Sequence, residues 1–215
     1  MQWDKTPVWS EWWNQVNRIT RGMAIVFGTL PMACDLIAAN RSRFKYDMVW
    51  EKNSATGFVN ADTRPMRRHE NILVFCCGDE TYNKQLQESE SEMVKSHARR
   101  GYSCAVSEPS EHLPGLNKRP NKWNVMINPG SVLRFKSVGN RAHEREHPTQ
   151  KPVALMRWLV ETYSNKGDTI LDPYAGSGST LLAAKEMGRG YIGIELQPEY
   201  IEVCKDRLKT EYLGL

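Results

Sequence analysis

Residues 168–195 constrain the fold of this chain more than any other segment. The apolar string TILD predicts a strand, GSGST predicts a turn into a helix, and YIGIE predicts a second strand. Gly176 and Gly178 let the backbone approach a ligand where a Cβ would intrude. Asp172 and Glu195 end the two strands, so we expect both carboxylates beside this turn, at one edge of a sheet.

The same turn predicts a nucleotide site. A carboxylate about 20 residues after a glycine turn, at the tip of the next strand, can accept hydrogen bonds from both hydroxyls of a ribose. The two glycines and two strand-end carboxylates together favour this interpretation over a plain tight turn with an incidental surface Glu195. The spacing does not choose the nucleotide, because the third glycine of a dinucleotide fingerprint is replaced here by Leu181.

Strand and helix patterns alternate at both ends of the chain. Residues 9–21 have helical spacing, and their tryptophans are expected in the core. Apolar strings typical of buried strands cover 23–28 and 71–77, and KYDMVWE over 45–51 predicts another strand, whereas the polar residues 53–70 predict a loop. The alternation predicts an α/β fold with a Rossmann-like, doubly wound and mostly parallel sheet.

Residues 78–146 differ from both ends. They are rich in Glu, Ser, Lys, Asn, Gly and Pro and have weak periodicity, which predicts an inserted region. We therefore expect three parts, with boundaries at 1–77, 78–146 and 147–215.

Composition and charge exclude few classes of protein. No apolar run is long enough to span a bilayer, and the first residues do not resemble a secretory leader, so we expect a cytoplasmic location and no membrane partner. Five cysteines without a C-x-x-C pair favour reduced thiols and no metal site. A net charge of +4 is compatible with a polyanionic partner.

Three motifs of the chain resemble the motifs of one known protein family. DPYAGSGST, over 172–180, is similar to the S-adenosylmethionine-binding motif of DNA amino-methyltransferases. HPTQKP, over 147–152, resembles the motif that closes over the methionine end of that cofactor, and GRGYIGIELQPEYIEVCKDRL resembles the ribose-binding strand and helix. Residues 1–77 resemble the segment after the catalytic strand in the permuted, β-type order of this family. The resemblance covers 1–77 and 145–210.

The resemblance implies methyl transfer from S-adenosyl-L-methionine to an exocyclic amine of double-stranded DNA. Adenine N6 is favoured over cytosine N4. In the family's order, 1–77 is the catalytic-side half, 78–146 forms or contains the target-recognition region, and 147–215 binds the cofactor. Whether the protein is a homodimer stays open.

The family's motifs also predict individual cofactor contacts. Asp172 and Tyr174 are expected in the methionine and adenosine pocket, the glycine loop under the methionine, and Glu195 at the ribose. The full predicted set is His147, Thr149, Gln150, Lys151, Asp172, Tyr174, Gly176, Ser177, Gly178, Ser179, Thr180 and Glu195.

The family holds its target amine with a tetrapeptide, D/N/S-P-P-Y/F/W, whose aromatic ring stacks on the flipped base. The sequence contains no such string, and its nearest match, Asp172-Pro173-Tyr174-Ala175, runs directly into the glycine turn. Trp3-Asp4 takes the place of a pair that follows the tetrapeptide in the family. We therefore expect the catalytic motif upstream of Met1 and predict no catalytic residue in this chain.

Two alternatives follow from the same motifs. One is a truncated, inactive methyltransferase remnant that binds cofactor or DNA or needs a complementing subunit. The other is a nucleotide-dependent oxidoreductase, which leaves HPTQKP without explanation.

Arg64, Arg67 and Arg68 form a basic cluster in the predicted loop. Such a cluster can contact DNA phosphates, and we predict DNA binding by these three residues. The alternative is a solvated charged loop.

Overall fold

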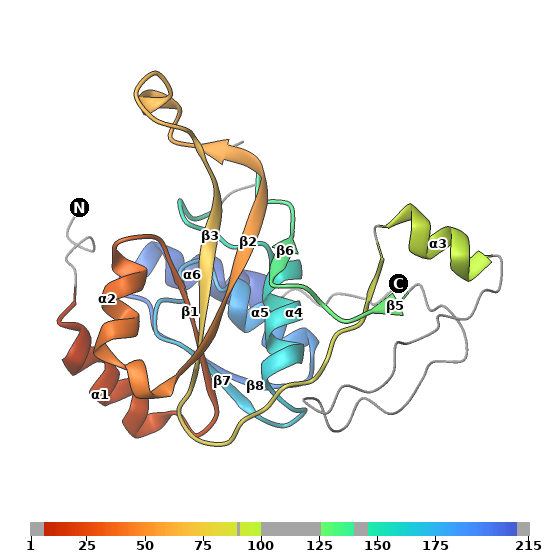
Figure 1. Ribbon diagram of the computed structural model, residues 1–215. Helices are drawn as coiled ribbons and strands as arrows, with labels where there is room; N and C mark the ends of the chain where they lie inside the picture. The colour runs from red at the N-terminus through yellow and green to blue at the C-terminus, as the bar shows by residue number, and fades with distance from the viewer. Residues whose placement is uncertain (1–6, 90, 100–125, 140–145, 210–215) are drawn as a thin grey trace. The chain divides into compact units, whose positions relative to one another are not determined.

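The computed structural model describes residues 7–89, 91–99, 126–139 and 146–209 (Figure 1). The chain divides into a main unit, Met1–Asn83 with Ser131–Leu215, and a small unit, Lys84–Gly130. The expectation for Trp3-Asp4 lies outside the described residues. Among the described helices, none has the length and apolar character needed to cross a membrane.

The larger sheet of the main unit has the strand order β1-β3-β2-β6. Its strands are β1 (Met23–Gly28), β2 (Phe44–Thr56), β3 (Arg67–Cys76) and β6 (Val132–Arg134). β3 is antiparallel to β1 and to β2, whereas β2 and β6 are parallel. The antiparallel pairing of β3 follows from its direct hairpin connection to β2, since a parallel neighbour requires a crossover.

Helices cover both faces of this sheet (Figure 1). Successive side chains of β3 point to opposite faces. Ile72 and Val74 pack with side chains of α4 (Val153–Tyr163) on one face. Leu73 and Phe75 pack with side chains of α1 (Trp9–Ile19) and α2 (Met32–Ala39) on the other face. All four strand side chains are at most 1% exposed. The result is a three-layer arrangement, as expected for a doubly wound sheet.

The tryptophans of α1 lie in the core as predicted. Trp13 is 1% exposed, its indole nitrogen donates to the carbonyl oxygen of Leu36 at 3.1 Å, and its ring lies 4.4 Å from that of Phe75. Trp9 and Trp12 are partly buried against the same cluster. These contacts fix α1 and α2 on one face of the sheet.

The prediction of a loop over 53–70 is wrong. β2 continues to Thr56, a short 3-10 turn covers Phe58–Asn60, and β3 begins at Arg67, so the segment is a hairpin. The hairpin extends beyond the other elements of the main unit (Figure 1). We call residues 52–69 the arm. Most of its side chains face solvent and lack the apolar alternation of a half-buried strand, which is why the sequence pattern did not reveal it.

The second sheet of the main unit contains the segment that we singled out in the sequence. β7 (Thr169–Asp172) pairs in parallel with β8 (Gly190–Gly193), and α5 (Ser179–Glu186) connects them. α6 (Pro198–Lys209) follows β8. Strand, turn, helix and strand therefore occur in the predicted order, and Asp172 is the last residue of its strand.

The described residues of the small unit form one helix and one short pair of strands. β4 (Gln87–Glu88) pairs antiparallel with β5 (Met126–Ile127), and α3 (Glu92–Arg99) lies between them in the sequence. The unit falls inside the region 78–146 that we expected as an insertion.

The described cysteines, Cys34, Cys76, Cys77 and Cys204, are free thiols.

Candidate functional site

The turn after β7 needs glycine at two positions. Gly176 and Gly178 have φ of 51° and 77°, in the left-handed region that other residues rarely adopt. A Cβ on Gly178 would lie well inside van der Waals contact with Sγ of Cys204, and one on Gly176 would lie 3.4 Å from the ring of His147. The two glycines therefore bring α6 and the HPTQKP segment close to the turn.

The Asp172 side chain shapes the first part of this turn. Its Oδ1 accepts a hydrogen bond from the backbone N–H of Tyr174 at 3.0 Å, and its carbonyl oxygen accepts one from Ile194 at 2.9 Å. Tyr174 is 64% exposed, so it is not a core residue. The string Asp172-Pro173-Tyr174 thus forms the first part of the turn, held by the hydrogen bond between Asp172 and Tyr174.

Glu195 connects the turn to the end of β8. Its Oε2 accepts from the N–H of Gly176 at 2.8 Å, and its Oε1 accepts from the N–H groups of Leu196 at 2.8 Å and Gln197 at 3.0 Å. A carboxylate offers about four lone-pair positions. One position on Oε2 therefore remains for a ligand, and a ribose that binds through both hydroxyls must displace one of these N–H groups.

A small cavity lies where the turn, the start of α5 and the HPTQKP segment meet. Ten of the twelve predicted cofactor residues line it, together with Ala175. Gly178 lies in the same turn, and Glu195, after β8, accepts a hydrogen bond from the N–H of Gly176 in that turn. Its volume is about 70 Å³, far below the roughly 300–1,000 Å³ of typical ligand pockets. It has room for one end of a nucleoside-sized ligand, with the remainder lying outside. The lining residues are His147, Thr149, Gln150, Lys151, Asp172, Tyr174, Ala175, Gly176, Ser177, Ser179 and Thr180.

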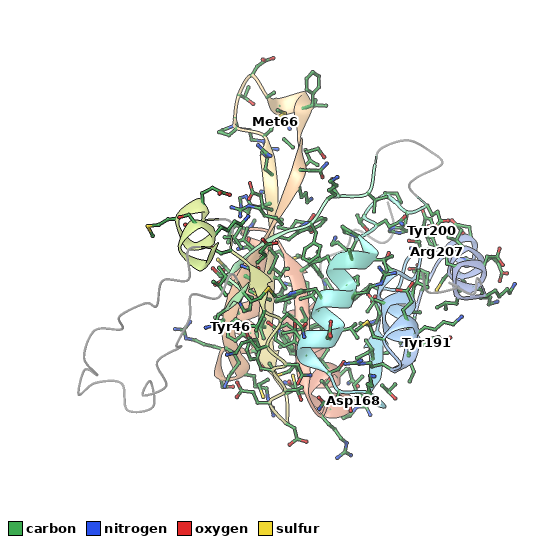
Figure 2. The ribbon with its side chains drawn as sticks, turned by 90° about the vertical axis from the view of Figure 1, so that its right-hand side faces the viewer. Tyr46, Met66, Asp168, Tyr191, Tyr200 and Arg207 are labelled. Atoms are coloured by element: carbon green, nitrogen blue, oxygen red, sulfur yellow. The ribbon has the colours of Figure 1, made fainter. Side chains whose placement is uncertain are left out.

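Two residues of α6 support the residues that line this cavity, and neither was predicted from the sequence. The guanidinium of Arg207 donates to the carbonyl oxygen of Ser177 at 2.6 Å and to its Oγ at 3.0 Å, and it pairs with Glu146 at 3.2 Å. The ring of Tyr200 lies 4.2 Å from that of His147, edge to face. Figure 2 shows Tyr200 and Arg207 on the same helix.

The helical spacing of these residues is the signal that the sequence carried. Residues 200, 204 and 207 follow the i, i+4, i+7 pattern that places side chains on one face of a helix. Cys204, between them, is buried against the turn, and burial raises the pKa of its thiol. The thiol therefore stays neutral at pH 7 and serves as packing.

Lys151 joins the cavity to the larger sheet. Its Nζ lies 3.2 Å from Oε2 of Glu70 on β3 and 5.1 Å from the ring centre of Phe27 on β1. The other oxygen of Glu70 accepts a hydrogen bond from Lys52. Burial by itself raises the pKa of Glu70, but the ammonium groups of Lys151 and Lys52 outweigh it and hold the pKa below its usual range.

The three arginines predicted to bind DNA lie on the arm, away from the cavity. Arg67 and Arg68 are at the start of β3, and Arg64 is in the turn before it. All three are exposed, and within the described part of the chain none of them forms an ion pair with a carboxylate. The prediction that they lie in a loop is corrected for Arg67 and Arg68, which are strand residues.

Comparisons with known proteins agree on one family. The sequence model of the DNA methylase family matches residues 4–206. The chain is 31% identical over 165 residues to the type II methyltransferase M.XycI of Xanthomonas campestris pv. cyanopsidis, covering 77% of this chain and 44% of that protein. It is 44% identical over 90 residues to the DNA adenine methyltransferase YhdJ of Escherichia coli, covering 41% of this chain and 31% of that protein.

The chain spans only part of these relatives. Matched segments cover 25–44% of the length of six curated relatives. The fold is similar to that of M1.HpyAVI solved with S-adenosylmethionine, with a TM-score of 0.61, 23% identity, and 94% of this chain and 82% of that chain covered. This similarity confirms the Rossmann-like α/β fold class.

Proposed function

We propose that this chain, which belongs to the DNA methylase family, forms part of an S-adenosylmethionine-dependent DNA amino-methyltransferase. In the reaction an exocyclic amine nitrogen takes the methyl carbon from a sulfonium, loses a proton, and leaves S-adenosylhomocysteine. The cofactor's role is to supply that electrophilic methyl group. The observation that carries the proposal is the cavity, in which two distant motifs of the sequence meet around a glycine turn.

The residues around the cavity fit one end of this cofactor. The glycines leave space where side chains would fill it, and the lining offers hydroxyl, amide and ammonium groups suited to an amino-acid end. We assign the ammonium of Lys151, with Thr149 and Gln150, to the cofactor carboxylate. Since Lys151 and Lys52 share one carboxylate, Glu70, the cluster has a net charge of +1, which an anionic ligand group would balance.

We assign the ribose to Glu195. The single open lone-pair position on Oε2 supports contact with one hydroxyl, and the second contact requires the N–H of Gly176 to move. The exposed Leu196 (80%) and Tyr174 (64%) supply apolar surface beyond the cavity for the adenine. His147, Asp172, Ser177, Gly178, Ser179 and Thr180 complete the cofactor-binding set.

We assign double-stranded DNA as the substrate, with Arg64, Arg67 and Arg68 on its phosphates. Adenine N6 is the proposed target, supported by the similarity to a DNA adenine methyltransferase. Residues 1–77 are proposed as the catalytic-side half, 78–146 as the region that contains target recognition, and 147–215 as the cofactor half.

Calorimetry with S-adenosylhomocysteine, 5′-methylthioadenosine and NAD tests the cofactor assignment. We expect the first ligand to bind, the second to bind more weakly because it lacks the amino-acid end, and NAD to show no heat. Glu195→Ala should weaken S-adenosylhomocysteine at least tenfold, because hydrogen bonds to a charged acceptor contribute about 1.5–3 kcal/mol each. NAD binding, or equal affinity in the Glu195→Ala variant, would contradict the assignment.

A second candidate is a cofactor-binding and DNA-binding chain that does not itself methylate DNA. The observation that favours it is the role of Asp172-Pro173-Tyr174, the string nearest to the family tetrapeptide: Asp172 closes the turn through the N–H of Tyr174. Asp172 and Tyr174 then line the cofactor cavity instead of holding the target amine.

Transfer of labelled methyl groups into mixed-sequence DNA separates the two candidates. The protein must come from a host without its own methylases. Under the second candidate the chain incorporates no more label than one methyl per protein molecule. Incorporation far above that level establishes turnover, and digestion to nucleosides then identifies adenine N6 or cytosine N4 as the target.

A further inference from the structure

The arm ends in an apolar tip that no described residue covers. Phe58 and Val59, in the turn between β2 and β3, are 83% and 93% exposed, and Met66 beside them is 44% exposed. Met66 lies at the outer end of the hairpin, away from the other labelled residues (Figure 2). Adjacent large apolar side chains at the end of an extension are a feature of surfaces that contact a partner.

Charge identifies the kind of partner. Residues 52–69 contain four lysines and arginines against one aspartate, a net charge of +3, whereas the whole chain of 215 residues has +4. Most of the excess positive charge of the protein is therefore carried by 18 residues around the apolar tip. A polyanion complements this surface, whereas a second copy of the arm would be repelled by it.

The shape of the arm suits one groove of a duplex. Arg67 and Arg68 are neighbours in a strand, so their side chains leave the ribbon on opposite faces. A two-stranded ribbon fits the major groove of B-DNA, about 12 Å wide, but not the minor groove, about 6 Å wide. A ribbon in the major groove with cations on both faces reaches the phosphates on both walls of that groove.

Hydrogen bonds anchor the base of the arm to the main unit. The Oδ1 of Asn53 accepts hydrogen bonds from the backbone N–H and the Oγ of Ser137, both at 2.8 Å. Toward the tip, Thr56 pairs with Arg67, and its Oγ1 donates to the carbonyl oxygen of Arg67 at 3.3 Å. The irregular register between Glu51 and Thr56 is thus held by the segment that follows β6.

We propose that the arm enters the major groove of duplex DNA and that Phe58 and Val59 contact base edges there, chiefly thymine methyl groups. The inference rests on the proposed function, because it presumes a DNA substrate. It adds a direct contact with bases to the phosphate contacts of the arginines. The C5 methyl of thymine is the apolar group that the major groove presents, and apolar side chains recognise it.

The test measures duplex binding by the full chain with two matched DNAs. One is a mixed-sequence duplex, and the other has uracil in place of every thymine, which removes only the major-groove methyl groups. Phe58→Ala/Val59→Ala should bind the thymine duplex at least about tenfold more weakly, because burial of a Phe side chain is lost. Its salt dependence should be unchanged, since no phosphate contact is removed.

The uracil duplex gives the decisive comparison. Wild-type protein should bind it about fourfold more weakly for each thymine methyl group that the tip buries, and the double variant should not distinguish the two duplexes. Val8→Ala serves as the control, because Val8 is a 60% exposed apolar residue outside the arm. The melting temperature of the double variant should equal that of the wild type, since both side chains are exposed.

Four results would overturn the inference, and they differ from failure of the proposed function. In the first, the double variant binds as tightly as the wild type. In the second, wild-type protein does not distinguish the thymine duplex from the uracil duplex. In the third, wild-type protein raises 2-aminopurine fluorescence equally in both duplexes and the double variant, which binds more weakly, does not, which indicates that the tip is a wedge in the base stack. The fourth is self-association that the double variant abolishes, which makes a second copy the occupant. If wild-type protein binds no duplex at all, the DNA assignment itself fails.

Discussion

The carboxylate of Glu70 lies 3.2 Å from the ammonium of Lys151, and this pair joins the base of the arm to the rim of the cavity. Their side chains are only 18% and 22% exposed, so the pair is shielded from solvent. Lys52, from the arm itself, pairs with the other oxygen of Glu70. One carboxylate therefore links the element assigned to DNA with the segment assigned to the cofactor.

Glu70→Gln should destabilise the main unit at neutral pH. The change removes the carboxylate from two shielded ammonium groups, and hydrogen bonds between charged groups contribute about 1.5–3 kcal/mol. Because the pKa of Glu70 is lowered in the folded protein, its contribution is present above the unfolded pKa and is lost as the pH falls.

Urea unfolding of both proteins as a function of pH measures this contribution. The difference in the free energy of unfolding should be constant at pH 6–8 and shrink as the pH falls below about 4.5. Glu80→Gln is the control, since Glu80 forms an exposed pair with Lys45 that should contribute little. A difference that grows toward low pH would contradict the ion-pair explanation.

Gly178→Ala should destabilise the protein more than Gly167→Ala. Both glycines have positive φ, 77° and 90°, so both variants carry the backbone cost of about 1–2 kcal/mol. An added Cβ at Gly167 has no heavy atom within 4 Å, whereas one at Gly178 overlaps Cys204. The difference between the two variants in thermal unfolding therefore isolates the packing of α6 against the turn. Equal destabilisation would mean that this packing is dispensable.

The amount of structure that the sequence revealed depends on how much apolar surface an element buries. β3 could be predicted because Ile72, Leu73, Val74 and Phe75 are buried on alternate faces, which leaves an unbroken apolar string. The turn after Asp172 could be predicted because its glycines satisfy a backbone requirement that no other residue meets. These signals are local and survive in a single sequence.

The arm and the support behind the cavity lacked such signals. Residues 56–69 are all exposed, so no burial pattern distinguishes a strand from a loop there. Arg207 contacts the turn from the C-terminal end of α6. In the sequence, only its helical spacing from Tyr200 indicates that it lies on the same face of that helix. Ten of the twelve predicted cofactor residues line one cavity, but the three backbone N–H groups that bond to Glu195 depend on backbone geometry that residue types do not encode.

Arg207→Ala should weaken S-adenosylhomocysteine binding by releasing the loop at Ser177. Arg207 is a positioning residue, since its guanidinium reaches the loop from behind and Ser177 is 2% exposed. Removal of two hydrogen bonds from a charged donor should reduce affinity roughly tenfold or more. Arg207→Lys should recover only part of this, because one ammonium cannot reproduce the planar fork that reaches Ser177 and Glu146 together.

Binding of 5′-methylthioadenosine distinguishes positioning from general destabilisation. That ligand lacks the amino-acid end assigned to the loop, so its affinity should change less than that of S-adenosylhomocysteine in the Arg207→Ala variant. Lys209→Ala, with its exposed pair to Asp206 on the same helix, is the control. Equal reductions in affinity for both ligands would make Arg207 a purely structural residue.

Replacing Arg64, Arg67 and Arg68 together by Ala should reduce the salt dependence of DNA binding. Each neutralised phosphate contributes about 0.9 to the slope of log affinity against log salt, so removal of three arginines corresponds to a decrease of nearly 3. The side chains are exposed and unpaired among the described residues, so the melting temperature should stay the same. Filter binding or fluorescence anisotropy from about 50 to 200 mM salt gives the slope. A triple variant with the wild-type slope on duplex DNA would show that these charges are only solvated, because an arginine cannot leave a phosphate without a counterion returning to the DNA.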